Sequence, residues 1–192
     1  MIDIYLDNNI FDFLYETNID IVHEFPKELF RLCITKEIKF ETEPIQDIAK
    51  QQFIQNLIEK DIKIIALFGF GDERHSPDKQ RVGGWDDDGA GWDADAEENE
   101  RYRAELNKKF LVEIKNPKHD LYKEEADIDL AVRSIKNIVL TFDKKEHKKK
   151  GPLNDAYEKG YKVVFLTGFD TSKDTLNLFV KLKLKEKGFE IW

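Results

Sequence analysis

The sequence predicts an α/β layer fold with a mainly parallel sheet, because short apolar runs alternate with stretches of helical periodicity. Five runs rich in β-branched and aromatic residues predict strands, at residues 2–6, 38–40, 62–68, 138–141 and 162–166. Helical spacing predicts helices at residues 42–58, with Thr42 as N-cap and Pro44 in the first turn, and at about 120–134 and 172–186. In such folds ligands bind at the carboxyl ends of the strands.

The length of 192 residues fits a single domain, residues 1–192. Residues 70–98 combine glycines and charges with little apolar periodicity, and we interpret them as an insertion in that domain. A cytoplasmic protein without a membrane span is expected, because the start shows no signal peptide and the apolar runs are too short to cross a bilayer. The single cysteine, Cys33, excludes an internal disulfide and is expected in a helical part of the core.

The net charge of −8 is distributed unevenly along the chain. Residues 86–100 contain eight acidic residues and no Lys or Arg, so the rest of the chain is neutral. Cations cluster elsewhere, at Lys144, Lys145, Lys148, Lys149 and Lys150. Because such a run can bind a phosphate backbone, Lys144 and Lys145 are candidate RNA-binding residues, although a solvated loop is the commoner explanation.

Three aspartates are predicted to gather at the carboxyl edge of the sheet. Asp7 follows the strand at 2–6 directly, and Asp143 follows the strand at 138–141. Asp127 lies on the helix before that second strand, where helical facing favours Asp127 over Asp129 as the inward-pointing residue. Carboxylates placed together repel one another unless a hard cation neutralises them. Mg²⁺ or Mn²⁺ suits such oxygen ligands, and it can activate water and stabilise charge on a phosphodiester.

These motifs resemble the PIN-domain nuclease family over residues 1–47 and 120–166. Asp7, with Asn9 two residues later, resembles the first family motif, Asp127 the third, and Asp143 in Leu140-Thr141-Phe142-Asp143 the fourth. The second motif, usually a glutamate on the helix after the second strand, has Asp47 at the expected offset and Glu43 as the alternative. The insertion has no counterpart in the short members of the family.

The resemblance implies a three-layer α/β/α sandwich and a metal-dependent endoribonuclease, such as the toxin of a toxin–antitoxin pair. It implies Asp7, Asp127 and Asp143 as metal ligands, Asp47 as a fourth catalytic acid, and Asn9 and Thr141 as residues that support the site or position the substrate. An antitoxin or regulatory protein and a second copy of the chain are the expected partners.

Two other functions stay open: cleavage of structured DNA, and a non-catalytic binding or regulatory role on the same fold. Phosphatases with an aspartyl nucleophile fit poorly, because Asn9 stands where they place a second aspartate. The four histidines lack the paired spacing of a zinc site, and residues 86–95 lack the ligand spacing of a calcium loop. A sharper hypothesis is that this acidic arm covers a basic groove until substrate or a partner displaces it.

Overall fold

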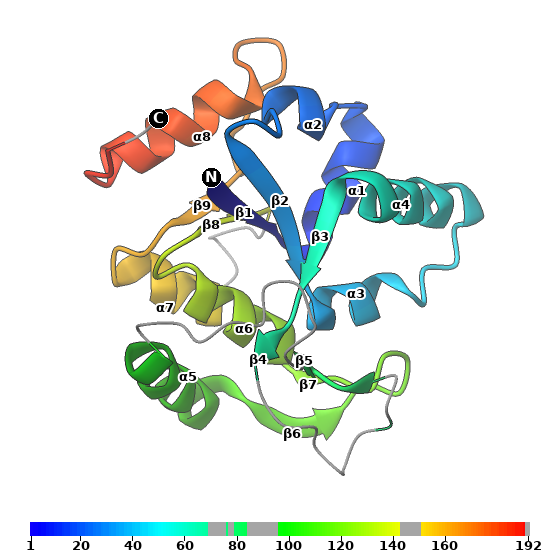
Figure 1. Ribbon diagram of the computed structural model, residues 1–192, viewed down its shortest axis with the longest axis vertical. Coiled ribbons are helices and arrows are strands. Elements are labelled where there is room, and N and C mark those ends of the chain that lie inside the picture. Colours follow the sequence, from blue (N-terminus) through cyan, green and yellow to red (C-terminus); the bar gives the residue numbers. More distant parts are fainter. Residues whose placement is uncertain (69–75, 77–78, 84–95, 143–150, 191–192) are drawn as a thin grey trace.

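The computed structural model describes residues 1–68, 76, 79–83, 96–142 and 151–190. Its centre is a parallel sheet of five strands in the order β3-β2-β1-β8-β9 (Figure 1). The prediction of an α/β fold with a parallel sheet is therefore confirmed. The strands are β1 (Ile2–Leu6), β2 (Phe30–Thr35), β3 (Ile62–Ile65), β8 (Ile138–Thr141) and β9 (Val163–Phe165).

The central strands are buried on both faces, as parallel strands between helical layers are. Tyr5 of β1 lies opposite Cys33 of β2 on one side and Val139 of β8 on the other, and all three are buried. Because every strand runs in the same direction, the residues that follow β1, β2 and β8 meet at one edge of the sheet.

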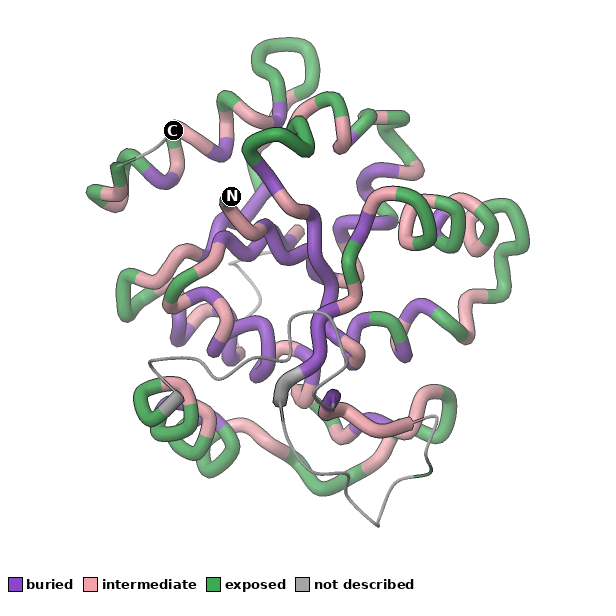
Figure 2. The backbone as a smooth tube through the Cα atoms, viewed as in Figure 1, coloured by how far each residue is buried: buried purple, intermediate pink, exposed green. Residues whose placement is uncertain are grey.

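Helices cover both faces of the sheet and complete three layers (Figure 1). One layer contains α1 (Asn8–Thr17), α4 (Ile48–Asp61) and α8 (Leu176–Glu186), with the short α2 (Ile21–Glu24) beside them. The other contains α3 (Lys36–Thr42), α6 (Glu125–Arg133) and α7 (Pro152–Glu158). Figure 2 shows the buried residues concentrated on the strands and on the sides of the helices that face them.

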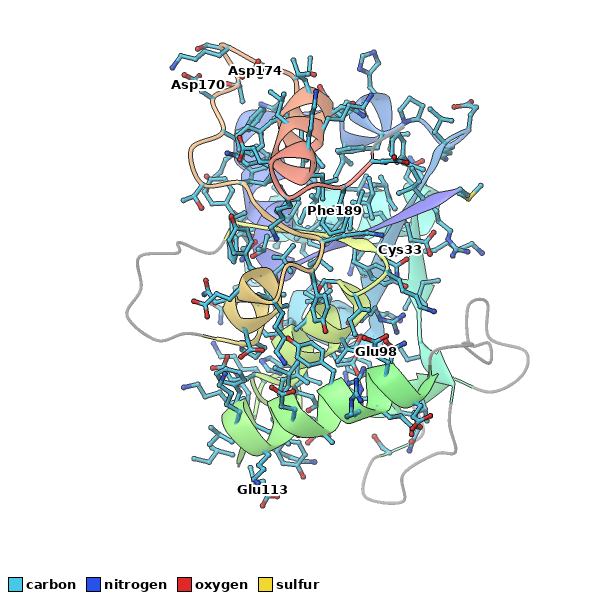
Figure 3. All side chains as sticks on the ribbon, turned by 90° about the vertical axis from the view of Figure 1, so that its left-hand side faces the viewer. Cys33, Glu98, Glu113, Asp170, Asp174 and Phe189 are labelled. Carbon is cyan, nitrogen blue, oxygen red and sulfur yellow. The ribbon has the colours of Figure 1, made fainter. Side chains whose placement is uncertain are left out.

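The long connection between β3 and α6 forms structure of its own outside the sandwich. It contains β4 (Leu67–Phe68) paired in parallel with β5 (Val82–Gly83), then α5 (Ala96–Phe110), and a hairpin of β6 (Val112–Lys115) and β7 (Tyr122–Lys123). Tyr102 and Leu106 of α5 are buried against the rest of the protein. In Figure 3, α5, with Glu98 at one end, lies at the opposite end of the molecule from Asp170 and Asp174, which precede α8.

The predicted second strand is wrong. Residues 38–40 belong to α3, and the second strand is β2, which contains Cys33. Cys33 is buried, so its place in the core is confirmed but its helical conformation is not. Apolar runs of four to eight residues suit a buried strand or a buried helix equally, and β2 was therefore misassigned. Thr35 marks the boundary, because its side chain accepts a hydrogen bond from the amide of Ile38 and caps α3.

The predicted helix boundaries also need correction. The helix at 42–58 begins at Ile48 instead, with Asp47 as N-cap, while Thr42 is the last residue of α3. The helix at 120–134 begins at Glu125, and the one at 172–186 begins at Leu176 after the cap Thr175. The strand at 62–68 is divided into β3 and β4. Among the described residues, no helix has the length and apolar character needed to cross a membrane.

Candidate functional site

Asp7 occupies the first position after β1 and is almost fully buried, with 5% of its surface exposed. It is the N-cap of α1, where its Oδ1 accepts a hydrogen bond of 2.7 Å from the amide of Asn8. Its Oδ2 accepts two more, from Asn9 Nδ2 at 2.7 Å and from Thr141 Oγ1 at 2.6 Å. The carboxylate is thus held at the carboxyl edge of the sheet by donors from both β1–α1 and β8.

Asn9 joins the ends of β1 and β8. Besides donating to Asp7, its Nδ2 lies 3.3 Å from Thr141 Oγ1, and its Oδ1 accepts a 2.7 Å hydrogen bond from the amide of Phe142. The ring of Phe142 in turn stacks on Phe13 of α1, with centroids 5.1 Å apart. The structure therefore brings together three residues that the sequence selected, Asp7, Asn9 and Thr141, and fixes the start of the chain that leads to Asp143.

Glu41, on the last turn of α3, is an acid that the sequence analysis did not select. Burial, together with the negative charges of Asp7, Glu124 and Glu125, raises the pKa of Glu41 to about 7. Within the described part of the chain, each charged neighbour that shifts this pKa is a carboxylate. We call Asp7, Glu41, Glu124 and Glu125 the edge cluster.

The two acids considered for the second motif have other contacts. Asp47 is exposed and accepts a 3.0 Å hydrogen bond from the amide of Lys50, as the cap of α4. Glu43 is exposed and forms a 2.6 Å ion pair with Lys79. Glu41 takes their place beside Asp7, because the correct second strand ends at Thr35 and α3 follows it at once. The sequence could have indicated Glu41 as an acid on the helix after the second strand. Because that strand was misplaced, Glu41 was not selected.

Glu124 and Glu125 lie where α6 begins. Glu124 is the N-cap with a left-handed backbone, φ 68°. Glu125 Oε1 accepts a 2.8 Å hydrogen bond from Arg81 Nε, and its Oε2 accepts one of 2.7 Å from the amide of Tyr122. Glu125 is therefore neutralised by a specific cation.

Asp127 and Asp129 differ from the expectation that Asp127 alone faces inward. Asp127 is half-buried in the first turn of α6, while Asp129 is buried with 1% exposed. Asp129 pairs with Arg103 of α5 and, at 2.9 Å, with Arg133 of its own helix. Helical facing was misleading because α6 is enclosed by α5 and α7 as well as by the sheet, so that most of its faces are interior.

Asp129 belongs to a second group of buried charges, which we call the interior cluster: Glu37, Arg103, Asp129 and Arg133. Burial alone raises the pKa of Asp129, but the charges of Arg133 and Arg103 outweigh burial and lower it. Burial and, to a smaller extent, the charge of Asp129 raise the pKa of Glu37 to about 7. Arg133 also donates to the hydroxyl of Tyr5 at 2.9 Å and to the carbonyl of Ile65 at 3.3 Å.

Several predicted site residues lie outside the described residues, namely Asp143, Lys144, Lys145 and the acidic stretch 86–95. Their roles, including the acidic arm as a cover, stay predictions. Among the residues that are described, no group of three His, Cys, Asp or Glu side chains is placed to hold a metal ion. That search does not include Asp143, which follows Phe142 in the sequence.

The donor chemistry of the edge cluster nevertheless fits a hard divalent cation. It supplies carboxylate oxygens, which Mg²⁺ and Mn²⁺ prefer, and burial together with the charges of three other carboxylates raises the pKa of Glu41. The side-chain oxygen of Asn8, next to Asp7, is buried and has no hydrogen-bond partner among the described residues. A cation would lower the cost of holding these oxygens together.

No protein-family model matches the chain, and no curated protein sequence is significantly similar to it.

Proposed function

We propose that this protein is a nuclease dependent on a divalent cation, with RNA as its substrate. The observation that carries the proposal is the contrast at one sheet edge between Asp7, oriented by three hydrogen bonds, and Glu41, crowded by carboxylates. Gathering partly buried carboxylates costs free energy, and proteins commonly retain such groups where their charge is used in a functional site. The resemblance of the Asp7, Asp127 and Asp143 motifs to PIN-domain nucleases supports the same function.

Asp7 and Glu41 would hold the cation, together with Asp127 and Asp143 as the resemblance implies. The bound Mg²⁺ or Mn²⁺ would supply an activated water and stabilise the charge that develops on the phosphodiester. Thr141 and Asn9 donate to Asp7 and keep its carboxylate in one orientation. In metal sites such supporting hydrogen bonds orient the ligands and tune the affinity.

Cleavage of a labelled RNA oligonucleotide tests the proposal. The protein should cut RNA with Mg²⁺ or Mn²⁺ present and not with excess chelator, and Asp7→Asn should lower the rate by about 100-fold or more. Asp3→Asn is the matched control, because Asp3 lies on the same strand but pairs with Arg31 at 2.5 Å. A folded Asp7→Asn variant with normal activity would exclude the mechanism, and a DNA oligonucleotide of the same sequence shows which nucleic acid is preferred.

A further inference from the structure

Arg81, from the predicted insertion, reaches the edge cluster and uses each nitrogen of its guanidinium. Its Nε donates to Glu125 at 2.8 Å, its Nη1 to the carbonyl of Lys79 at 2.6 Å and its Nη2 to the carbonyl of Asp120 at 2.6 Å. Only 10% of the side chain is exposed. A planar fork with this many contacts fixes geometry far better than a lysine could.

These contacts hold a turn that has an unfavourable backbone at both ends. Asp120 and Glu124 have left-handed φ values of 60° and 68°, which cost conformational energy for residues other than glycine. Arg81 binds the backbone carbonyl of Asp120 and the side-chain carboxylate of Glu125, the residue that follows Glu124. Glu125 also accepts the amide of Tyr122, which lies within the turn. Arg81 therefore fixes the turn that carries Glu124 and the first residue of α6, Glu125.

The segment around Arg81 is anchored independently on α3, the helix that carries Glu41. Lys36 Nζ donates to the carbonyl of Val82 at 2.9 Å, and the Arg81 guanidinium lies 5.8 Å from the centre of the Phe40 ring. In Figure 1, β5, β7 and the start of α6 lie together below the sheet. Arg81 thus connects α3 to the turn before α6, and these two elements supply three of the four acids in the edge cluster.

We propose that Arg81 is a positioning residue of the edge cluster, which fixes Glu124 and Glu125 relative to Glu41. This inference rests on the proposed function, because it concerns the cation site of the nuclease. Glu125 is committed to Arg81 and the Tyr122 amide, and the neighbouring Glu124 lies 4.0 Å from the Nζ of Lys123. The insertion therefore contributes to the proposed site through Arg81, the residue immediately before β5.

The test compares Arg81→Gln and Arg81→Lys with Lys79→Gln in the full-length chain. Lys79→Gln is the matched control, since it breaks an ion pair of the same segment, with Glu43, and leaves the turn untouched. Titration calorimetry should show Mn²⁺ affinity weakened about 10-fold in Arg81→Gln, less in Arg81→Lys and not in the control. Hydrogen exchange of the Tyr122 amide, measured without metal, should accelerate in Arg81→Gln only.

Glu125→Gln removes the carboxylate that Arg81 binds and should weaken Mn²⁺ binding as much as Arg81→Gln does. The double variant should bind Mn²⁺ no more weakly than either single variant. This second route keeps the test decisive if Arg81→Gln fails to fold. Wild-type protein that binds no Mn²⁺ would overturn the proposed function and this inference together. Normal wild-type binding with unchanged Mn²⁺ affinity in Arg81→Gln and Glu125→Gln would overturn the inference alone.

Discussion

The interior cluster and the edge cluster both take acids from α3 and α6, but only the interior cluster contains arginines. In the interior cluster, Asp129 faces Arg103 and Arg133, and the arginines lower its pKa despite complete burial. In the edge cluster, Glu41, one helical turn beyond Glu37, faces three carboxylates that raise its pKa. The paired charges of the interior cluster serve the fold, whereas the carboxylates around Glu41 are where we propose that a cation binds.

Removing a carboxylate should therefore have opposite effects in the two clusters. The largest effect is expected for Asp129→Asn, which leaves Arg133, with 11% of its side chain exposed, without its acid. The free energy of unfolding should fall by about 3–5 kcal/mol, the usual cost of an uncompensated buried charge. Urea denaturation at neutral pH measures it, with Glu186→Gln on the surface of α8 as a control that should leave stability unchanged. A small loss for Asp129→Asn would mean that the interior cluster does not stabilise the fold.

Glu41→Gln should instead stabilise the metal-free protein at alkaline pH. The pKa of Glu41 is raised from its ordinary 4.5 to about 7, so the fold disfavours ionisation. The associated stability is fully present below about pH 4.5 and is lost as the pH rises through 7. Between pH 5 and pH 8 in chelator, wild type should lose about 1–2 kcal/mol more than Glu41→Gln, allowing for partial solvent screening.

Glu37, whose pKa is also about 7, contributes to the pH dependence of both proteins, so their difference isolates Glu41. Added Mg²⁺ or Mn²⁺ should reverse the order at pH 8, because the cation stabilises only an ionised carboxylate. Equal pH dependence in the two proteins, or equal stabilisation by metal, would remove the distinction between the clusters.

The smallest effects are expected from two hydroxyl deletions. Tyr5→Phe removes a 2.9 Å hydrogen bond from Arg133 in the interior, and Thr141→Val removes the 2.6 Å hydrogen bond to Asp7 at the edge. Each should cost about 1 kcal/mol of unfolding free energy. Only Thr141→Val should weaken Mn²⁺ binding in calorimetry, since only Asp7 belongs to the proposed cation site. Equal Mn²⁺ affinities in the two variants would show that Thr141 does not orient Asp7.

The sequence by itself determined the α/β class, and it predicted the carboxyl edge of the sheet as the place of the site. Strand β1 followed by Asp7, and strand β8 ending in Thr141, are local patterns, because a buried parallel strand needs an apolar run and a polar residue marks its end. Asn9 was selected through the resemblance to the first motif of the family, and the structure adds that it bonds to both Asp7 and the chain after β8.

Only the tertiary structure decided which other acids accompany Asp7. Local periodicity could not separate strand β2 from helix α3. The position of Glu41 on the helix after β2 was therefore missed. It could not show that Asp129 meets Arg103, 26 residues away on α5, because helical facing says nothing about what encloses a helix on its other sides. The role of Arg81 was equally hidden, since its contacts with Asp120 and Glu125 join segments that are far apart in sequence. Charge balance in a folded protein depends on such long-range contacts, and these exist only once the layers have packed.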